Sequence, residues 1–258
     1  MIEALVSRDN SKLKLVRSLS RKKGRRENGL FFVEGIRITQ EALQEVKNYV
    51  KFLLVSETFA KKNKIFVKSL DETGSMVYTA KDDLFREVCD TEHPQGIGAV
   101  VEIPNYTDEV LLGRQFILAL DGVADPGNMG TMIRTAEAVG VDAVVLLGDC
   151  VDVYNPKTVR STMGAIFRMP IICDTLDILN KLKGQGVTVV ATALRNAVSI
   201  EQIQLEGPRL LIIGSEARGV SESVLAQADM IAKIPMKGRA ESLNAAIAAG
   251  ISMYMLKP

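Results

Sequence analysis

Three apolar runs in this chain lead directly into polar turns that contain glycine. The runs and their turns are Phe116 to Leu120 before Asp125-Pro126-Gly127-Asn128-Met129-Gly130, Leu210 to Ile213 before Gly214-Ser215-Glu216-Ala217-Arg218-Gly219, and Ile231 to Ile234 before the polar stretch from Pro235 to Asn244. Nearly continuous apolar runs are typical of parallel strands that are covered on both faces. Ligands bind outside the carboxyl ends of such strands, so we expect the three turns to build one site.

Alternating strand-like and helix-like segments predict an α/β fold. Expected strands of the second half are 116–120, 143–147, 170–173, 187–191, 210–213 and 230–234, and expected helices are 129–139, 156–166, 176–183, 221–228 and 243–255. The first half is expected to have strands at 30–33, 50–55, 75–79 and 98–103 and helices at 7–19, 35–46 and 81–88. Turn-forming residues at 104–113 indicate a linker. We therefore expect an amino-terminal domain at 1–103 and a carboxy-terminal domain with a parallel sheet at 114–258.

Composition excludes several classes of protein. No apolar run reaches the length of a membrane helix, and the amino terminus lacks the apolar core of a signal peptide. Cys89, Cys150 and Cys173 are widely spaced without a CxxC pair, and His93 is the only histidine, so neither a disulfide framework nor a metal site is expected. The three cysteines are expected to be buried. These features predict a soluble, cytoplasmic protein without a metal.

Positive charge is concentrated near the amino terminus. Residues 1–28 carry nine Lys or Arg against three acidic residues, whereas 106–258 carry 14 basic and 16 acidic side chains. Basic arms of this kind bind nucleic-acid phosphates. The candidate RNA-binding residues lie in one run, which we expect to be a mobile loop: Arg21, Lys22, Lys23, Arg25 and Arg26. A merely solvated helix and loop is the alternative.

Two common nucleotide-binding fingerprints are absent from the turns. Gly127-Asn128-Met129-Gly130 is not GxGxxG, and no acidic residue about 20 positions later ends a second strand, as the dinucleotide fingerprint requires. No GxxxxGK[ST] occurs either. A ligand would therefore be held in another way.

The polar turns carry a resemblance to a known family. Three motifs in order, together with the segment from Arg160 to Pro170, resemble the SpoU or TrmH family of S-adenosylmethionine-dependent RNA ribose 2′-O-methyltransferases of the SPOUT superfamily. The motifs are Asn128 onward (NMGTMIRTAEAVG), Ile213 to Gly219, and Ile234-Pro235-Met236 with Glu241 to Ala246. Three ordered motifs are far more specific than one glycine loop. The resemblance covers residues 115–258.

The amino-terminal half resembles the α/β substrate-binding domain that some members carry, a type also found in certain RNA-binding ribosomal proteins. The matching pieces are Phe31 to Gly35 and Pro94 to Val101. The resemblance also implies a trefoil knot near the carboxyl end, S-adenosyl-L-methionine bound in the knotted loops, and a homodimer across which the active site is completed.

Arg134 is the catalytic residue that the resemblance implies. The family assigns the matching arginine to activation of the ribose 2′-OH, but a guanidinium has a pKa above about 12 and is a poor base. We favour stabilisation of developing alkoxide charge or binding of the adjacent phosphate, which leaves the proton acceptor open. A helix-surface arginine is the structural alternative.

The resemblance places four further residues at the catalytic pocket, each with a structural alternative. Asn128 would orient the arginine or the substrate, or cap a helix. Glu216 would hold Arg134 or the substrate, or complement a helix dipole. Ser242 and Asn244 would line the pocket, or begin the last helix.

Cofactor contacts in this family are implied to come mainly from the backbone of glycine-rich turns. The matching positions are Gly214, Ile234, Met236 and Leu243, with Thr192, Ala193 and Leu194 as a weaker contact. Their side chains alone would indicate positions in the hydrophobic core.

The leading hypothesis is a methyltransferase that acts on a ribose 2′-OH, with ribosomal RNA as its substrate because the additional domain favours a large one. Transfer RNA remains an alternative. A second hypothesis is a non-catalytic RNA-binding or ribosome-assembly factor, and a third is a nucleotide-dependent oxidoreductase, which lacks its fingerprint.

Overall fold

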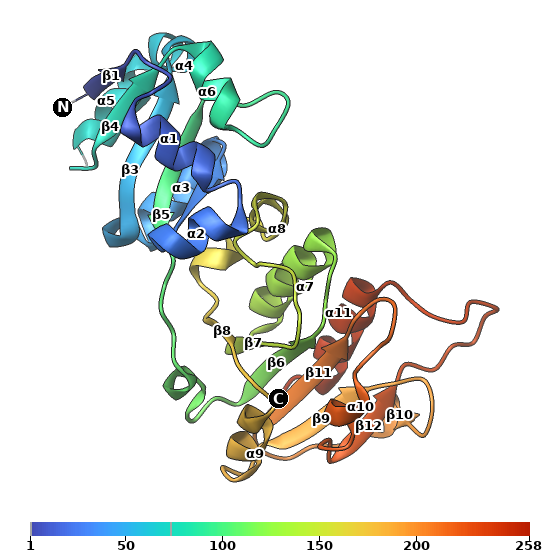
Figure 1. Ribbon diagram of the computed structural model, residues 1–258. Helices are drawn as coiled ribbons and strands as arrows, with labels where there is room; N and C mark the ends of the chain where they lie inside the picture. Colours follow the sequence, from blue (N-terminus) through green and yellow to red (C-terminus); the bar gives the residue numbers. More distant parts are fainter. Residues whose placement is uncertain (1, 73) are drawn as a thin grey trace. The chain divides into compact units, whose positions relative to one another are not determined.

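The computed structural model describes residues 2–72 and 74–258, which form two compact units. The first unit comprises Met1–Pro104 together with Tyr154–Phe167, and the second comprises Asn105–Val153 together with Arg168–Pro258. The segment Tyr154–Phe167 thus groups with the amino-terminal unit, although the predicted boundary placed it in the other domain. Figure 1 shows the order of the elements in each unit.

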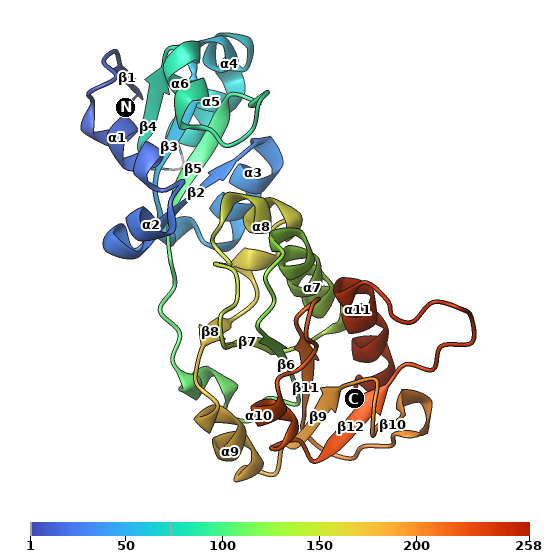
Figure 2. The same ribbon diagram turned by 45° about the vertical axis from the view of Figure 1, so that its right-hand side comes forward.

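A five-stranded mixed sheet forms the centre of the first unit, in the order β1-β4-β3-β5-β2. Its strands are β1 (Ile2–Leu5), β2 (Leu30–Glu34), β3 (Val50–Ser56), β4 (Val77–Ala80) and β5 (Ile97–Glu102). Its helices are α1 (Ser11–Ser18), α2 (Lys22–Asn28), α3 (Ile36–Glu45), α4 (Glu57–Lys62), α5 (Lys64–Glu72), α6 (Asp82–Val88) and α8 (Pro156–Ser161), with 3-10 turns η1 (Lys47–Tyr49) and η3 (Ala165–Phe167). Figure 2 shows α1 and α3 on opposite sides of this sheet.

The core on the α1 side is made by residues at helical spacing and by alternate strand residues. Leu13 and Val16 of α1 pack with Phe85 of α6 against Phe52 and Tyr78 of the sheet. The rings of Phe52 and Tyr78 meet edge to face, with centroids 5.3 Å apart. The apolar residues whose spacing predicted the first helix therefore form its buried face.

The basic run is helical, so the expectation of a mobile loop was wrong. Helix α2 ends at Gly29, whose φ of 64° is left-handed and whose N–H donates to the carbonyl of Arg25. Gly24 is buried against α1, where a Cβ would lie 2.1 Å from the carbonyl oxygen of Ser18. The helices α4 and α5 were not predicted at all.

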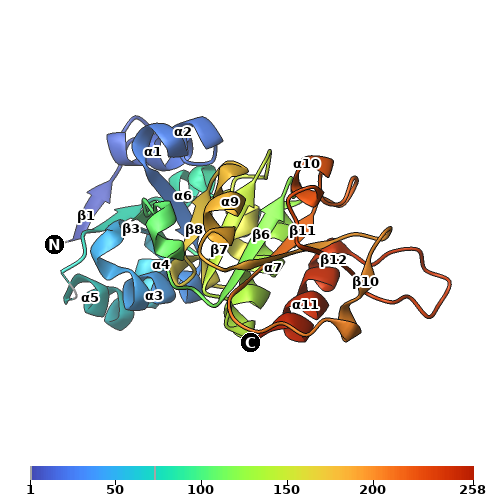
Figure 3. The ribbon, with the colours of Figure 1, turned by 90° about the horizontal axis from the view of Figure 1, so that it is seen from below.

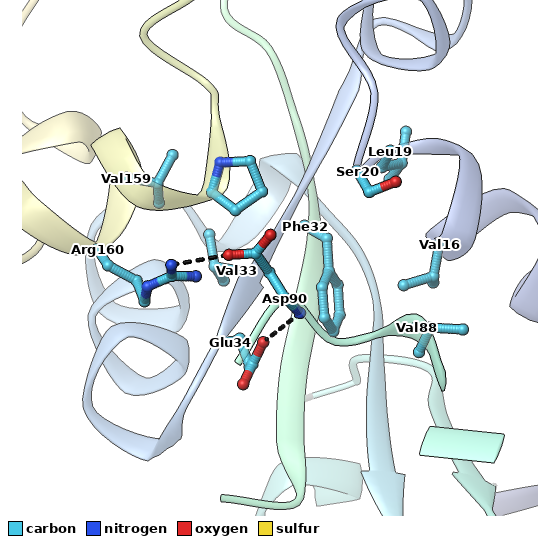
Figure 4. Close-up of a pocket in the computed structure, with 11 residues that line it drawn as sticks. Val16, Leu19, Ser20, Phe32, Val33, Glu34, Val88, Asp90, Val159 and Arg160 are labelled. Carbon is cyan, nitrogen blue, oxygen red and sulfur yellow. Dashed lines mark hydrogen bonds and ion pairs between the residues drawn. The ribbon is translucent and has the colours of Figure 1, made fainter. Parts of the chain in front are cut away.

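The segment Tyr154–Phe167 packs within the first unit. The ring of Phe31 in β2 lies 4.8 Å from the ring of Tyr154 and 6.3 Å from that of Phe167, between centroids. Arg160 forms a 2.7 Å ion pair with Asp90 beside a pocket lined by apolar side chains of α1, β2, α6 and α8 (Figure 4). Helix α8 ends at Ser161, short of the predicted 166, because Met163 and Gly164 have φ values of 49° and 90°.

The second unit has a seven-stranded parallel sheet in the order β10-β12-β9-β11-β6-β7-β8. Its strands are β6 (Phe116–Asp121), β7 (Ala143–Leu147), β8 (Ile171–Cys173), β9 (Thr188–Thr192), β10 (Val198–Ser199), β11 (Arg209–Gly214) and β12 (Met230–Lys233). Its helices are α7 (Pro126–Val139), α9 (Asp177–Lys183), α10 (Glu222–Leu225) and α11 (Ala245–Leu256), with η2 (Asp108–Leu111) and η4 (Ile200–Gln202). Figure 3 shows α7 and α11 on one face of the sheet and α9 and α10 on the other.

The central strands of this sheet are buried along their whole length, as the apolar runs predicted. Every residue of β6, β7 and β11 is buried. Two details differ from expectation. Leu111, in the stretch expected to be a linker, lies in the core of this unit with 1% of its surface exposed, and the Cys173 side chain is exposed.

Other expected features concern membranes and metals. Across residues 2–72 and 74–258, no helix has the length and apolar character that crossing a membrane requires. Over the same residues, no three His, Cys, Asp or Glu side chains gather in a way that could hold a metal ion.

Candidate active site

The turns that follow β6 and β11 meet through a pair of side chains. The amide nitrogen Nδ2 of Asn128 donates to Oε1 of Glu216 at 2.7 Å. The other oxygen of Glu216, Oε2, accepts from the backbone N–H of Ala124 at 3.4 Å. Because Gly214 lies opposite Asp121 in the β11–β6 register, the two turns leave neighbouring strands at the same level.

The start of α11 joins the same pair. Nδ2 of Asn244 donates to Oδ1 of Asn128 at 3.1 Å, so Asn128 bridges the other two loops. Asn244 also caps α11, because its Oδ1 accepts from the N–H groups of Ala246 and Ile247 at 2.9 and 3.3 Å. Asn244 thus begins the last helix and at the same time contacts Asn128.

Asn128 does not cap its helix. Asp125 is the N-cap of α7, and its Oδ1 accepts from the N–H of Asn128 at 2.7 Å. Asp125 was not predicted, although an acidic residue directly before a proline is a standard sequence signal for a helix start. With the cap supplied by Asp125, the Asn128 side chain is available to the other two loops.

The loop that carries Glu216 is a tight turn rather than the start of a helix. The N–H of Ser215 donates to the carbonyl of Gly219 at 3.0 Å, and the reverse bond is 2.9 Å. A Cβ on Gly214 would lie 2.0 Å from the backbone of Gly219 and Val220, so only glycine allows the chain to fold back there. The structural alternative for Glu216, a role at a helix dipole, was therefore wrong.

Arg134 lies apart from this network within one chain. Asn128 and Arg134 are six residues apart on α7, which separates them by roughly 240° around the helix and about 9 Å along it. Arg134 is exposed, and within the described chain no residue forms an ion pair or hydrogen bond with its guanidinium. Glu216 thus holds Asn128 and not Arg134. Ser242 is exposed as well, and no described residue bonds its hydroxyl.

The segments expected to hold a cofactor follow three adjacent strands. Ala191 of β9 pairs with Ile212 of β11, and Thr192 pairs with Ala232 of β12. This register brings the ends of β9, β11 and β12 to one edge of the sheet, and with them the expected positions Thr192, Leu194, Gly214, Ile234 and Met236.

The side chains at this edge differ in what they can offer a ligand. The Thr192 hydroxyl donates to the carbonyl of Ile212 at 3.0 Å, which ties β9 to β11. Leu194 is 64% exposed, and Ile234, Met236 and Leu243 are partly exposed. Partly exposed apolar side chains beside strand-end backbone suit a ligand with an apolar ring and several polar groups. The edge thus fits S-adenosylmethionine, whose adenine is such a ring.

The predicted RNA-binding residues divide into two kinds. Arg21, Lys22, Lys23 and Arg26 are exposed. Arg25 is buried, with 3% of its surface exposed, and its Nη1 donates to the carbonyl of Leu19 at 2.7 Å. The structure therefore places Arg25 where it fastens α2 to α1 instead of facing solvent.

Family models match both halves of the chain. The SpoU rRNA Methylase family matches residues 115–254, and the MRM3-like substrate binding domain matches residues 10–99. The 23S rRNA (guanosine(2553)-2′-O)-methyltransferase RlmP of Bacillus subtilis is 38% identical over 257 residues, which cover 99% of this chain and 100% of that relative.

Two solved structures bound to AdoMet are similar over almost the whole chain. An rRNA methyltransferase from Sinorhizobium meliloti has a TM-score of 0.85 at 30% identity and covers 98% of this chain and 97% of that one. The SpoU methyltransferase AviRb from Streptomyces viridochromogenes has a TM-score of 0.84 at 29% identity and covers 95% and 96%.

Proposed function

The chain belongs to the SpoU rRNA methylase family of S-adenosylmethionine-dependent methyltransferases, and we propose that it methylates a ribose 2′-OH of 23S ribosomal RNA. The contact between Asn128, Glu216 and Asn244 carries the proposal, because it joins the three motif loops into one polar site. We propose a guanosine as the target nucleotide, since the full-length relative RlmP is a guanosine methyltransferase.

The cofactor residues are part of the proposal. We propose that Thr192, Leu194, Gly214, Ile234, Met236 and Leu243 hold S-adenosylmethionine at the edge formed by β9, β11 and β12. Bound there, the cofactor would supply a methyl group on a sulfonium for transfer to a ribose oxygen, with S-adenosylhomocysteine as the leaving group. The chain's own residues have to present that oxygen and stabilise its negative charge.

Arg134 is the proposed electrostatic catalyst. A guanidinium keeps its charge at neutral pH, so it stabilises an alkoxide or holds the neighbouring phosphate rather than accepting a proton. Because Arg134 lies apart from Asn128, Glu216 and Asn244 within one chain, these three are proposed to orient the ribose beside the Arg134 of a second copy. Ser242 is proposed to contact the substrate from the exposed loop before α11. The ribose proton therefore leaves to a group other than Arg134.

A homodimer is proposed to complete the site. Exposed apolar side chains on α11 recur at the spacing of one helix face, with exposed fractions of 56% for Ile247, 38% for Ile251 and 56% for Tyr254. The exposure of Arg134 within one chain supports a role at a site that a second copy completes. Light scattering checks this, because Ile251→Glu is expected to yield a monomer if α11 is the interface.

A trefoil knot near the carboxyl end and a cytoplasmic location are proposed with the same function. The solved structures that match almost the entire chain support the fold, and a ribosomal RNA substrate supports the location. A crystal structure that traces 214–244 without threading one loop through another would rule the knot out. Fractionation that finds the protein outside the cytoplasm would rule out the location.

The test of the function is methyl transfer from labelled S-adenosylmethionine to 23S rRNA taken from cells without the protein. We expect transfer by the wild type, and loss of transfer with unchanged cofactor affinity in Arg134→Ala. Lys181→Ala is the matched control, since Lys181 is an exposed cation paired at 2.7 Å with Asp108. Labelling of transfer RNA alone would favour the other substrate. Full complementation of a deletion strain by Arg134→Ala would favour an assembly factor.

A further inference from the structure

Asp121 is a buried carboxylate for which the proposed reaction has no role. It is the last residue of β6, only 7% of its surface is exposed, and it stands opposite Gly214 of β11 on one side and Leu147 of β7 on the other. Burying a charged side chain between two neighbouring strands costs free energy unless the side chain is paired or hydrogen-bonded. No cation forms an ion pair with it among the residues that the structure describes.

Asp121 instead binds the backbone of the loop that carries Glu216. Its Oδ2 accepts from the N–H of Ser221 at 2.7 Å. Ser221 is the residue at which the chain leaves this loop and enters α10. The carboxylate therefore fastens the exit of the loop to the end of β6.

Three further features keep this contact close. Gly214 lets the loop return against its own strand, because any Cβ there would collide with Gly219 and Val220. Gly148, with a φ of 61°, lies near the other oxygen of Asp121, where a Cβ would be 3.4 Å from Oδ1. Val220 is buried in the core of the unit, so the exit of the loop is held by packing as well as by the bond.

The loop thus makes two contacts with the chain around the end of β6, one with the last residue of the strand and one with the segment that follows it. At the inner tie Asp121 binds Ser221, and at the outer tie Glu216 binds Asn128 and the N–H of Ala124, three residues beyond Asp121. The outer tie is exposed, whereas the inner one is part-buried and ends on the buried Asp121. We therefore expect the inner tie to keep the loop in position when substrate displaces water at the outer one.

We propose that Asp121 is a positioning residue for methyl transfer, which sets Glu216, and through it Asn128 and Asn244, by holding the N–H of Ser221. This inference rests on the proposed function for its kinetic consequence. Its structural consequence does not depend on any reaction. Misplacement of a substrate-orienting group by about 1 Å can cost roughly 100-fold in rate.

Hydrogen exchange of the protein alone tests the structural step. In Asp121→Ala we expect faster exchange of the amides from Ser215 to Ser221. Asp142→Ala is the matched control, because Asp142 accepts from the N–H groups of Gln115 and Phe116 at 2.9 Å and so holds the opposite end of the same strand. Exchange in 215–221 that is unchanged in Asp121→Ala, or equally raised in Asp142→Ala, would overturn the proposal.

Kinetics test the positioning step. We expect Asp121→Ala to lower kcat by about 10- to 100-fold with little change in cofactor affinity, and Asp121→Asn to retain most activity because its Oδ1 can still accept from Ser221. The double variant Asp121→Ala, Glu216→Ala should be no slower than Glu216→Ala alone, since both changes release one loop. Independent, multiplying effects, or a lowered Tm with an unchanged kcat, would contradict the role. If Asp121→Ala does not fold, Asp121→Ser replaces it in the same cycle. Absence of methyl transfer by the wild type would count against the proposed function and leave the exchange result standing.

Discussion

Asn128 and Glu216 lie 88 positions apart in the sequence and meet in a 2.7 Å hydrogen bond between an amide nitrogen and a carboxylate oxygen. The parallel sheet makes this meeting possible, because β6 and β11 are neighbours and end at the same level. The bond is charge-assisted and exposed, so its importance lies in orientation more than in stability.

Replacing Asn128 tests that bond. Asn128→Ala removes the donor to Glu216, and we expect methyl transfer to fall by about 10- to 100-fold. Asn128→Asp should be slower still, because it sets a second carboxylate against Glu216. Single-turnover rates at saturating cofactor measure the order of activity among the wild type, Asn128→Ala and Asn128→Asp. An Asn128→Asp protein that outperforms Asn128→Ala would show that repulsion at this position is unimportant.

Asn244 allows its capping role to be separated from its place in the site. Aspartate is as good an N-cap as asparagine, so Asn244→Asp should unfold at nearly the wild-type temperature but lose the donor to Asn128. Asn244→Ala should lose both and cost about 1 kcal/mol of unfolding free energy. Thermal melts and methyl-transfer assays on both variants distinguish the roles. Equal activity of Asn244→Asp and wild type would contradict a role in the site.

Gly214 should tolerate no side chain. In Gly214→Ala the new methyl group would lie 2.0 Å from the backbone of Gly219, so the loop has to move. We expect the free energy of unfolding to fall by about 1 to 3 kcal/mol, and the affinity for the cofactor to fall as well. Gly238→Ala is the control, since a Cβ there meets nothing within 4 Å. Denaturant melts and calorimetry measure the two effects. A Gly214→Ala protein as stable as Gly238→Ala would disprove the packing argument.

The basic helix α2 should separate RNA binding from folding. Changing Arg21, Lys22, Lys23 and Arg26 to glutamine should lower the slope of log affinity against log salt by about 0.7 to 0.9 for each RNA phosphate that is no longer neutralised, with the Tm nearly unchanged. Arg25→Gln should instead lower stability by about 2 kcal/mol, because it breaks the buried bond to Leu19. Filter binding over a salt series and thermal melts provide the comparison. An Arg25→Gln protein with the same Tm as the wild type would contradict this separation of RNA binding from folding.

The three cysteines should react with alkylating reagents in a fixed order. Burial raises the pKa of the Cys89 thiol, an effect that the nearby Glu34 carboxylate increases, and burial likewise raises the pKa of Cys150. A raised pKa means less reactive thiolate at about pH 8. We expect exposed Cys173 to be labelled first by iodoacetamide, as followed by mass spectrometry. Cys173→Ser should abolish the fast phase, and rapid labelling of Cys89 would argue against its burial.

Much of the second unit could be predicted because its signals are local. The apolar runs at Phe116 and Leu210 became fully buried strands, since a covered parallel sheet needs apolar residues on both faces. The convergence of Asn128, Glu216 and Asn244 followed from placing polar turns at the ends of such strands. Their individual partners did not follow, because hydrogen bonds between distant loops depend on strand order, and strand order is not a local property.

The first unit was harder to predict for the same reason. Helix α2 looks like a loop because Gly24 interrupts it, and only its close approach to Ser18 explains the glycine. Arg25 is indistinguishable by sequence from the cations beside it, yet it alone is buried. The placement of Tyr154–Phe167 depends on aromatic contacts with Phe31, which no periodicity within the segment reveals.

That placement limits how this chain can be divided. A fragment beginning at Asn105 would keep the segment from Tyr154 to Phe167 and discard the β-sheet that shelters it. The side chains of Tyr154, Val159 and Phe167 would then be exposed to solvent. The truncated protein should aggregate unless these three residues were replaced by hydrophilic ones. A relative that consists of the catalytic half alone must solve this problem in its own sequence between β7 and β8.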